Sequence, residues 1–249
     1  MQINNFKNLN NYPNLRKISE KIASLNNLQE KKINLIFRNA DKDYFEFCEE
    51  IAKLAIDISS KWKENINFIS KSYDELCKDT FKEQLYFKKY GEYSAIEKKR
   101  NTLEIYSSNT KMRSYMIALL VSQIFWLNHY KIIRWFETKI KNIQCNHFID
   151  IGAGHGFFTK LFLKYNNPLS VLICDISKTS LELTKSIISE KEEHINLNYI
   201  NKDFLELDEK NKFDFLIMGE VIEHVYNPVK FIKSAKNIIN PNGRIFIST

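Results

Sequence analysis

The second half of the chain alternates short apolar runs with amphipathic stretches, and no other feature constrains its fold as strongly. The amphipathic stretches have apolar residues at three- and four-residue spacing, which predicts helices, whereas the apolar runs have the length of strands. A strand, a helix and a strand repeated in this way form right-handed crossovers and a mostly parallel sheet with helices on both faces. We therefore predict a doubly wound α/β domain over residues 144–249. Its expected strands are 147–151, 170–175, 197–200, 213–218 and 244–248, and its expected helices lie near 155–166, 177–190 and 228–239.

Residues 1–143 follow a helical pattern instead. Apolar residues recur at three- and four-residue spacing, and only Pro13 and Gly91 interrupt this half. We expect an all-helical region here, with caps at Asp41, Ser72 and Asn109. The expected helices lie near 41–69, 72–90, 94–106, 110–127 and 129–142. This region is a candidate substrate cap for the domain that follows it.

The net charge of +7 is concentrated in the N-terminal half of the chain. Residues 1–147 hold 25 Lys and Arg against 17 Asp and Glu, whereas residues 148–249 hold 12 against 13. Such an excess suits an anionic ligand or a nucleic acid, but these lysines alternate with acidic residues at helical spacing, as on a solvated face. We therefore expect a solvated helical surface here, and the charge alone does not predict a nucleic-acid partner, although it leaves one open.

The four cysteines are scattered and form no Cys-x-x-Cys pair. This spacing argues against a disulfide framework or a zinc site and favours a reducing compartment. The N-terminus has no secretory pattern, and the longest apolar stretch, 116–127, is shorter than the roughly 20 residues that span a bilayer. We predict a cytoplasmic protein without a membrane partner.

The turn after the first expected strand reads Asp150-Ile-Gly-Ala-Gly-His-Gly156. Glycine has no Cβ, so a ligand can approach the backbone at Gly152 and Gly154, where the chain turns into a helix. The free N–H groups and the positive end of that helix then face the ligand. The Gly-x-Gly-x-Gly spacing differs from the Gly-x-Gly-x-x-Gly of dinucleotide-binding proteins. The Asp150 carboxylate would repel a pyrophosphate, but it can receive an ammonium group.

Three more strands deliver a polar residue at their carboxyl ends, the edge where such sheets bind ligands. Asp175 ends the second strand, and its carboxylate can accept two hydrogen bonds from ribose hydroxyls. Asp203 follows the third strand and is a candidate partner for an adenine amino group, with Phe204 beside the ring. Glu220 ends the fourth strand. The sequence thus predicts a nucleoside-binding site at one edge of the sheet.

At these positions, residues 148–249 resemble the class I S-adenosylmethionine-dependent methyltransferase family. The loop at 150–156 is similar to the family's first motif, and Asp175 and Asp203 match its ribose- and adenine-binding acids. Gly219-Glu-Val-Ile-Glu-His-Val225, followed by Asn-Pro228, resembles the fourth-strand motif of the ubiquinone-biosynthesis O-methyltransferase group. Asn242-Gly-Arg-Ile-Phe-Ile-Ser-Thr resembles the fifth-strand motif.

The resemblance implies a Rossmann-like fold, S-adenosylmethionine as cofactor, and methyl transfer to an oxygen or nitrogen of a small molecule. No metal is expected. His224 is the candidate catalytic base, because an imidazole with a pKa near ~6.5 can accept a hydroxyl proton at neutral pH. The alternative is that His224 only orients its loop or Glu220. The residues expected to bind the cofactor are Asp150, Gly152, Ala153, Gly154, Gly156, Asp175, Ile176, Asp203, Phe204 and Glu220.

The family's fold continues past the fifth strand into a helix and an antiparallel hairpin, whereas this sequence ends at Thr249 on that strand. An uncovered strand edge invites pairing. We therefore expect the N-terminal helices, or a second copy in a homo-oligomer, to cover it. A truncated chain that binds the cofactor without turnover is one alternative function.

Two further alternatives stay open. A nicotinamide-dependent oxidoreductase shares the ribose carboxylate, although the glycine spacing and Asp150 disfavour it. Glu220, Glu223 and His224 resemble the metal-binding motif of small-RNA 2′-O-methyltransferases, and their spacing would place all three on one helical face. This metal-assisted alternative needs a further ligand after the fifth strand.

Overall fold

The computed structural model describes residues 9–92, 94, 108–141, 143–188, 195–208 and 212–249. The chain divides into two compact units, Met1–Lys131 and Ile132–Thr249. We expected the boundary at residue 143, but it lies within α7 (Leu127–Ile140). The reason is Phe136, whose ring lies 5.1 Å from that of Phe158 and 4.6 Å from that of Phe246. The last turns of α7 therefore pack as part of the second unit.

The described residues of the N-terminal unit form helices joined by short turns and contain no strand, as predicted. It contains α1 (Pro13–Ala23), α2 (Asn27–Arg38), α3 (Lys42–Lys61), α4 (Ile66–Tyr90) and α6 (Asn109–Phe125). Helix α6 packs against both α3 and α4, and α1 packs against α2, α3 and α4. Ten residues of α6 are buried, and they lie on all its faces. It is the central helix of this unit.

The first two expected helix caps have different outcomes. Asp41 caps α3 as predicted, because its carboxylate accepts the Tyr44 N–H at 2.8 Å. Ser72 was expected to begin a helix, but it lies inside α4, buried, with its hydroxyl 2.8 Å from that of Ser114. The true cap of α4 is Asn65. A serine suits both a cap and a buried helix contact, and here tertiary packing decides.

The third expected cap is displaced by one residue. Asn109 is the first residue of α6, and the Ser108 hydroxyl accepts the Lys111 N–H in its place. The helix expected near 94–106 lies outside the described residues, apart from residue 94. No single helix of the described segments is long and apolar enough to cross a membrane; α6 and α7 satisfy that test only as a pair, bent by 83°.

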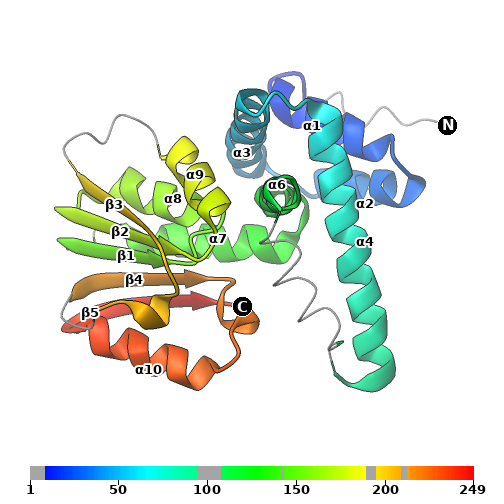
Figure 1. Ribbon diagram of the computed structural model, residues 1–249. Helices are drawn as coiled ribbons and strands as arrows, with labels where there is room; N and C mark the ends of the chain where they lie inside the picture. Colours follow the sequence, from blue (N-terminus) through cyan, green and yellow to red (C-terminus); the bar gives the residue numbers. More distant parts are fainter. Residues whose placement is uncertain (1–8, 93, 95–107, 142, 189–194, 209–211) are drawn as a thin grey trace. The chain divides into compact units, whose positions relative to one another are not determined.

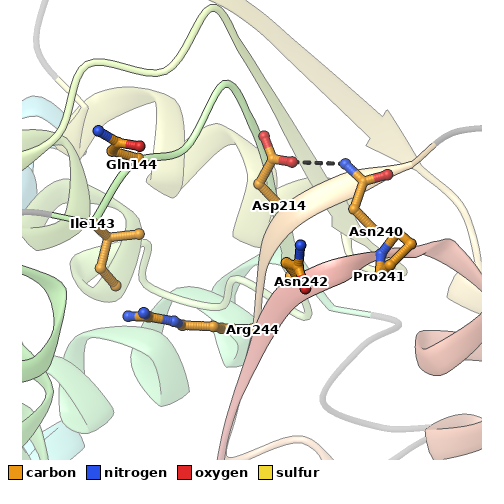
Figure 2. Close-up of a pocket in the computed structure, with 8 residues that line it drawn as sticks. Ile143, Gln144, Asp214, Asn240, Pro241, Asn242 and Arg244 are labelled. Carbon is orange, nitrogen blue, oxygen red and sulfur yellow. Dashed lines mark hydrogen bonds between the residues drawn. The ribbon is translucent and has the colours of Figure 1, made fainter.

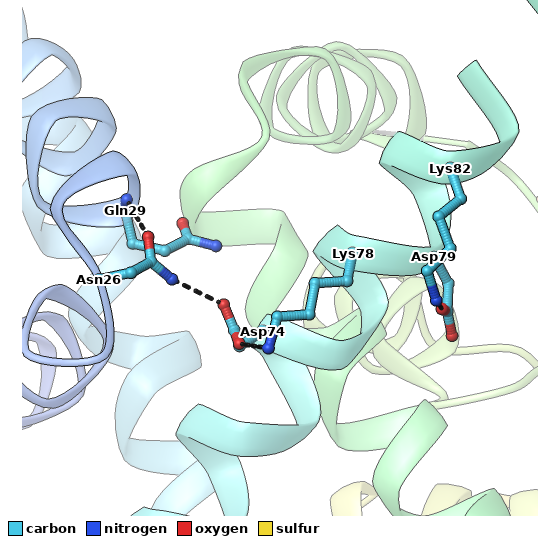
Figure 3. Close-up of polar contacts among 6 residues, drawn as sticks. All are labelled: Asn26, Gln29, Asp74, Lys78, Asp79 and Lys82. Carbon is cyan, nitrogen blue, oxygen red and sulfur yellow. Dashed lines mark hydrogen bonds and ion pairs between the residues drawn. The ribbon is translucent and has the colours of Figure 1, made fainter. Parts of the chain in front are cut away.

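A polar link joins α2 to α4 in the N-terminal unit (Figure 3). The Asn26 side chain caps α2 by accepting the Gln29 N–H at 2.9 Å, and its amide donates to Asp74 at 3.1 Å. Asp74 also pairs with Lys78 of the same helix at 2.6 Å. Because Asp74 is only 8% exposed, its two partners compensate the burial of its charge.

The C-terminal unit is a five-stranded parallel sheet, in agreement with the predicted doubly wound fold (Figure 1). Its order is β3-β2-β1-β4-β5. Helices α8 and α9 cover one face and α10 covers the other. The strands are β1 (His147–Ile151), β2 (Ser170–Asp175), β3 (Asn196–Asn201), β4 (Phe213–Gly219) and β5 (Ile239–Ser248); the helices are α8 (Phe157–Tyr165), α9 (Lys178–Ile187) and α10 (Pro228–Ile238).

Side-chain alternation along the strands separates two apolar layers. On the α8 face, Phe148 stacks on Phe162 with ring centroids 4.3 Å apart. On the α10 face, Ile149, Leu216 and Phe231 belong to one buried cluster. Helices therefore cover both faces of the sheet, and a ligand can bind only at its edges.

Strand β5 is longer than predicted. The segment Asn240-Pro-Asn-Gly243 lies between the expected helix at 228–239 and the expected strand at 244–248, but it forms the irregular start of the strand, opposite a register shift between Phe213 and Phe215 of β4. Within the described residues, β4 is the one strand that pairs with β5. Whether a second copy covers the other edge of β5 stays a prediction.

Candidate functional site

The loop between β1 and α8 is built on three glycines with left-handed backbones. The φ angles of Gly152, Gly154 and Gly156 are 67°, 56° and 72°. A Cβ on Gly152 would lie 2.6 Å from a methyl group of Val221, and one on Gly156 would lie 2.9 Å from the Cα of Thr184. We expected these glycines to allow the approach of a ligand. The structure adds two internal reasons, namely backbone conformation and tight packing.

Asp150 lies beneath this loop and is 2% exposed. Its Oδ2 accepts the hydroxyl of Thr159, on α8, at 2.5 Å. Burial raises the pKa of Asp150 to about 7, the Thr159 hydrogen bond opposes this rise, and the charge of Asp175 adds to it. Asp150 thus anchors the loop to α8. Its expected contact with an ammonium group stays a prediction.

Thr159 had no role in the sequence analysis. Its only signal was a hydroxyl in the first turns of a helix with an otherwise apolar face. His155 is 8% exposed, and its Nδ1 accepts the Phe157 N–H at 3.2 Å. It therefore helps to cap α8.

Asp175, at the end of β2, is positioned by the same loop. Its Oδ2 accepts the Gly154 N–H at 3.1 Å, and its Oδ1 accepts the Ser177 N–H at 2.7 Å. Burial raises its pKa to about 6, although these two hydrogen bonds oppose the rise. A carboxylate has about four lone-pair positions, so two remain for ribose hydroxyls. Ile176, next in the chain, is 53% exposed and offers an apolar surface beside them.

Asp203 and Phe204 follow β3 and lie in different environments. Asp203 is exposed, and its Oδ1 accepts the Leu205 N–H at 2.9 Å, which caps the short turn Phe204–Glu206. The ring of Phe204 is 4% exposed and lies 4.8 Å from that of Phe231 on α10. Phe204 thus belongs to the apolar layer on the α10 face. The adenine contacts expected of both residues stay predictions.

Glu220 follows β4 and has an unusual conformation. Its φ is 56°, a left-handed value that is uncommon outside glycine. Its N–H donates to the Ser248 carbonyl at 3.0 Å, whereas its side-chain Oε1 is buried without a hydrogen-bond partner among the described residues. The next residue, Val221, packs on Gly152. The loops after β1 and β4 are therefore in contact beside Glu220.

The shared helical face proposed for a metal site is wrong. Glu223 and His224 lie in the 3-10 turn Ile222–His224, but Glu220 precedes this turn with a non-helical backbone. The described residues contain no group of three or more His, Cys, Asp or Glu that could hold a metal ion. His224 is exposed, and its role as a base stays a prediction.

A pocket of about 570 Å³ lies at the opposite, amino-terminal edge of the sheet (Figure 2). Its lining comes from the segment before β1 and from the first residues of β4 and β5. Asp214 in this pocket accepts the Asn146 N–H at 2.8 Å, the His147 N–H at 3.0 Å and the Asn240 amide at 2.6 Å. None of the predicted site residues lines this pocket. They gather instead at the carboxyl edge.

The carboxyl-edge residues suit S-adenosylmethionine in three respects. Asp175 keeps acceptor positions for a ribose, Ile176 is exposed beside it, and Glu220 presents a buried carboxylate oxygen without a partner. All three follow the carboxyl ends of β2 and β4, the two neighbours of β1, and the strand order reverses between β1 and β4, which is where such sheets bind their ligands.

Comparison with known proteins supports the resemblance to methyltransferases. Residues 149–245 match the family model of the methyltransferase domain. Ubiquinone biosynthesis O-methyltransferase of Coxiella burnetii is 26% identical over 118 residues, which cover 47% of this chain and 48% of the relative. The protein of the same name from Rickettsia typhi is 32% identical over 127 residues, 49% of this chain and 50% of the relative. The chain thus spans about half the length of these curated relatives.

Two solved structures that match about half of this chain are methyltransferases by name. The N-methyltransferase NodS of Bradyrhizobium japonicum in complex with S-adenosyl-L-homocysteine is 14% identical, with a TM-score of 0.39, over 49% of this chain and 59% of that one. An O-methyltransferase from Nostoc punctiforme, itself assigned as such only provisionally, is 16% identical, with a TM-score of 0.45, over 55% and 40%. From the family model and the sequence relatives we conclude that residues 149–245 form a methyltransferase domain of the class I S-adenosylmethionine-dependent family.

Proposed function

We propose that this chain is a methyltransferase that uses S-adenosylmethionine to methylate an oxygen or nitrogen of a small molecule. The observation that carries the proposal is the joint placement of the Asp150–Gly156 loop and Asp175. The loop donates the Gly154 N–H to the Asp175 carboxylate, so the first motif and the ribose acid form one unit. The sequence relatives support the same reaction class, since they are O-methyltransferases by name.

When bound, S-adenosylmethionine supplies a methyl group on a positively charged sulfur. The chain's own part is to hold the two reactants in line, because methyl transfer depends mainly on positioning. Asp175 would fix the ribose through its free lone pairs, since its two backbone donors already fix the carboxylate. Burial is the largest cause of the raised pKa values of Asp150 and Asp175, so a cationic ligand beside them would lower the cost of burying their charges.

Isothermal titration calorimetry with S-adenosyl-L-homocysteine, the demethylated product, tests the proposal. We expect one site per chain with a dissociation constant in the micromolar range, which is an order-of-magnitude expectation for a site of this size. A folded chain that shows no heat of binding with either the product or S-adenosylmethionine would refute the proposal.

A parallel titration with NADH, followed by its fluorescence, separates the oxidoreductase alternative. Both cofactors present ribose hydroxyls to Asp175, but only NADH presents a pyrophosphate to the loop above Asp150. We expect no saturable signal with NADH at concentrations that saturate the site with S-adenosyl-L-homocysteine. Tighter binding of NADH would favour the oxidoreductase.

A further inference from the structure

The pocket at the amino-terminal edge of the sheet has a chemistry that the cofactor site does not use. Its volume of about 570 Å³ is typical of pockets that hold small organic ligands. Arg244 brings a positive charge to its lining and Asp214 a negative one. The other lining residues are apolar, carry amides or have no side chain: Ile143, Gln144, Asn240, Pro241, Asn242 and Gly243.

The fold satisfies the two charged groups of the pocket to different degrees. The Asp214 carboxylate already accepts three hydrogen bonds, two from backbone N–H groups and one from the Asn240 amide. The Arg244 guanidinium, in contrast, makes no hydrogen bond or ion pair with another described residue. A guanidinium has five N–H donors and no acceptor. The pocket therefore offers a ligand unused donors, together with a carboxylate whose charge is largely compensated.

Strand alternation decides on which side of β5 the Arg244 side chain lies. Arg244 and Phe246 are two positions apart on β5, so their side chains share one face of the sheet. On that face the Phe246 ring packs against Phe136 of α7, with centroids 4.6 Å apart. In Figure 2 the Arg244 side chain extends towards Ile143, in the segment that follows α7. The guanidinium and this segment therefore line the pocket from opposite sides.

The β5 side of the pocket is preformed. The Asn240 amide is fixed to Asp214 at 2.6 Å. A Cβ on Gly243 would lie 2.7 Å from a methyl group of Ile239 and 3.0 Å from the Phe213 carbonyl oxygen, so this part of the chain packs directly on β4. A wall that is already ordered lowers the entropic cost of binding a ligand.

We propose that this pocket binds a small organic acid with one carboxylate and an apolar body. The planar fork of Arg244 would pair with both carboxylate oxygens. The amides of Gln144 and Asn242 would donate to the remaining lone pairs of the carboxylate. The Ile143 side chain would contact the apolar body of the acid. A phosphate suits the pocket less, because one guanidinium would then have to compensate nearly two negative charges.

The acid would be a second ligand of the domain and not the methyl acceptor. Strand β4 runs from the pocket to Glu220, and its seven residues span roughly 20 Å at about 3.3 Å per residue. A small molecule held by Arg244 does not reach across this distance to a methyl group bound at the carboxyl edge. Binding at this second site therefore does not depend on the proposed methyltransferase function.

Ligand-observed NMR with three acids, namely benzoate, 3-phenylpropionate and hexanoate, tests the pocket. We expect saturable binding with a dissociation constant on the order of 1 mM, as is usual for ligands of about ten heavy atoms. Arg244→Gln should weaken the binding at least tenfold. Arg244→Lys keeps the charge but not the planar fork, and should weaken it about threefold. Saturating S-adenosyl-L-homocysteine should not displace the acids.

Matched controls separate the pocket from a general effect of charge. Arg38→Gln removes the same charge from an exposed arginine of α2 that does not line the pocket, and it should leave the affinity for the acids unchanged. Asp175→Ala, at the cofactor site, should leave it unchanged as well. Benzamide, the neutral counterpart of benzoate, should not bind at concentrations at which benzoate saturates. Arg244→Gln should keep the melting temperature of the original chain, since the guanidinium has no partner within the described segments.

Three results would overturn the proposal. The first is that the folded chain binds none of the three acids. The second is equal affinity in the original chain and in Arg244→Gln, because the acids would then bind elsewhere. The third is tighter binding of inorganic phosphate than of all three acids, which would contradict the class of ligand. If the same sample binds the acids but not S-adenosyl-L-homocysteine, the proposed methyltransferase function fails and the second site stands.

Discussion

Asp150 and Asp214 belong to neighbouring strands of one sheet, yet their carboxyl groups are held in opposite ways. Asp150, near the carboxyl end of β1, is buried with one hydroxyl donor, and its pKa rises to about 7. Asp214, near the start of β4, is partly exposed. Burial tends to raise the pKa of Asp214 too, but hydrogen bonds from Asn240, His147 and Asn146 outweigh it and hold the pKa below its ordinary value.

The contrast distinguishes an edge whose carboxylate is satisfied within the fold from the edge proposed to bind the cofactor. At the amino edge, three donors satisfy one carboxylate, which ties the start of β1 to β4 and β5. At the carboxyl edge, Asp150 and Asp175 both have raised pKa values, and Oε1 of Glu220 has no partner within the described segments. Carboxylates that a fold leaves under-satisfied in this way are candidates for ligand binding.

The largest effect is expected for Asp175→Ala. Two hydrogen bonds from ribose hydroxyls to a carboxylate would be lost, so the affinity for S-adenosyl-L-homocysteine should fall roughly 10- to 100-fold. Calorimetry measures this directly, and circular dichroism checks that the variant is folded. An affinity within twofold of the original would contradict the ribose role and remove the main functional difference between the edges.

Asp214→Ala is the matching change at the amino edge, and it should have the reverse profile. Three donors lose their acceptor, so the free energy of unfolding should fall by about 1–2 kcal/mol, since partly exposed N–H groups can still bond to water. The affinity for S-adenosyl-L-homocysteine should not change. Urea denaturation and calorimetry give the two numbers. A loss of affinity without a loss of stability would mean that the amino edge binds the ligand.

Asp150→Asn should have the smallest effect and a characteristic pH dependence. The folded-state pKa of about 7 lies above the ordinary value of 3.8, so the folded chain holds this proton more tightly than the unfolded chain does. Asp150 therefore contributes stability at pH below about 4, and this contribution is lost as the pH rises towards about 7. The asparagine variant should lack this loss and gain about 1 kcal/mol at pH 8, because no charge is buried. Urea denaturation at pH 5 and pH 8 measures the difference, and an equal pH dependence in both chains would show that Asp150 is not the titrating group.

The sheet and its ligand edge could be predicted because both follow from local patterns. Strand-length apolar runs between amphipathic helices determine a parallel sheet, and a parallel sheet brings Asp150 and Asp175 to one edge. The prediction that Ser72 caps a helix was wrong for the opposite reason. Ser72 is held by a hydrogen bond with Ser114, which lies 42 residues away in the chain and therefore leaves no local signal. The left-handed backbone of Glu220 was likewise unpredictable, because nothing in a glutamate suggests positive φ.

The sequence predicted the start of β5 too late, at residue 244 instead of Ile239, because residues 240–243 follow a pattern that usually forms a turn. Asn-Pro-Asn-Gly is a turn sequence, and proline lacks the N–H that a regular strand needs. Here the strand begins irregularly, with a register shift opposite Phe213 and Phe215, and Asn240 donates to Asp214. The hydrogen bond from Asn240 also gives the Asp214 carboxylate one of its donors. Because the two residues are far apart in the sequence, local patterns could not predict this contact at the amino edge.

Hydrogen–deuterium exchange with and without S-adenosyl-L-homocysteine tests the difference between the two edges most directly. Slower exchange is expected in the segments 150–158, 175–178 and 219–224, which form the carboxyl edge. The segments 143–147 and 240–244 at the amino edge should exchange equally fast in both states. Protection confined to the amino edge would contradict the account, because the ligand would then occupy the pocket beside Asp214.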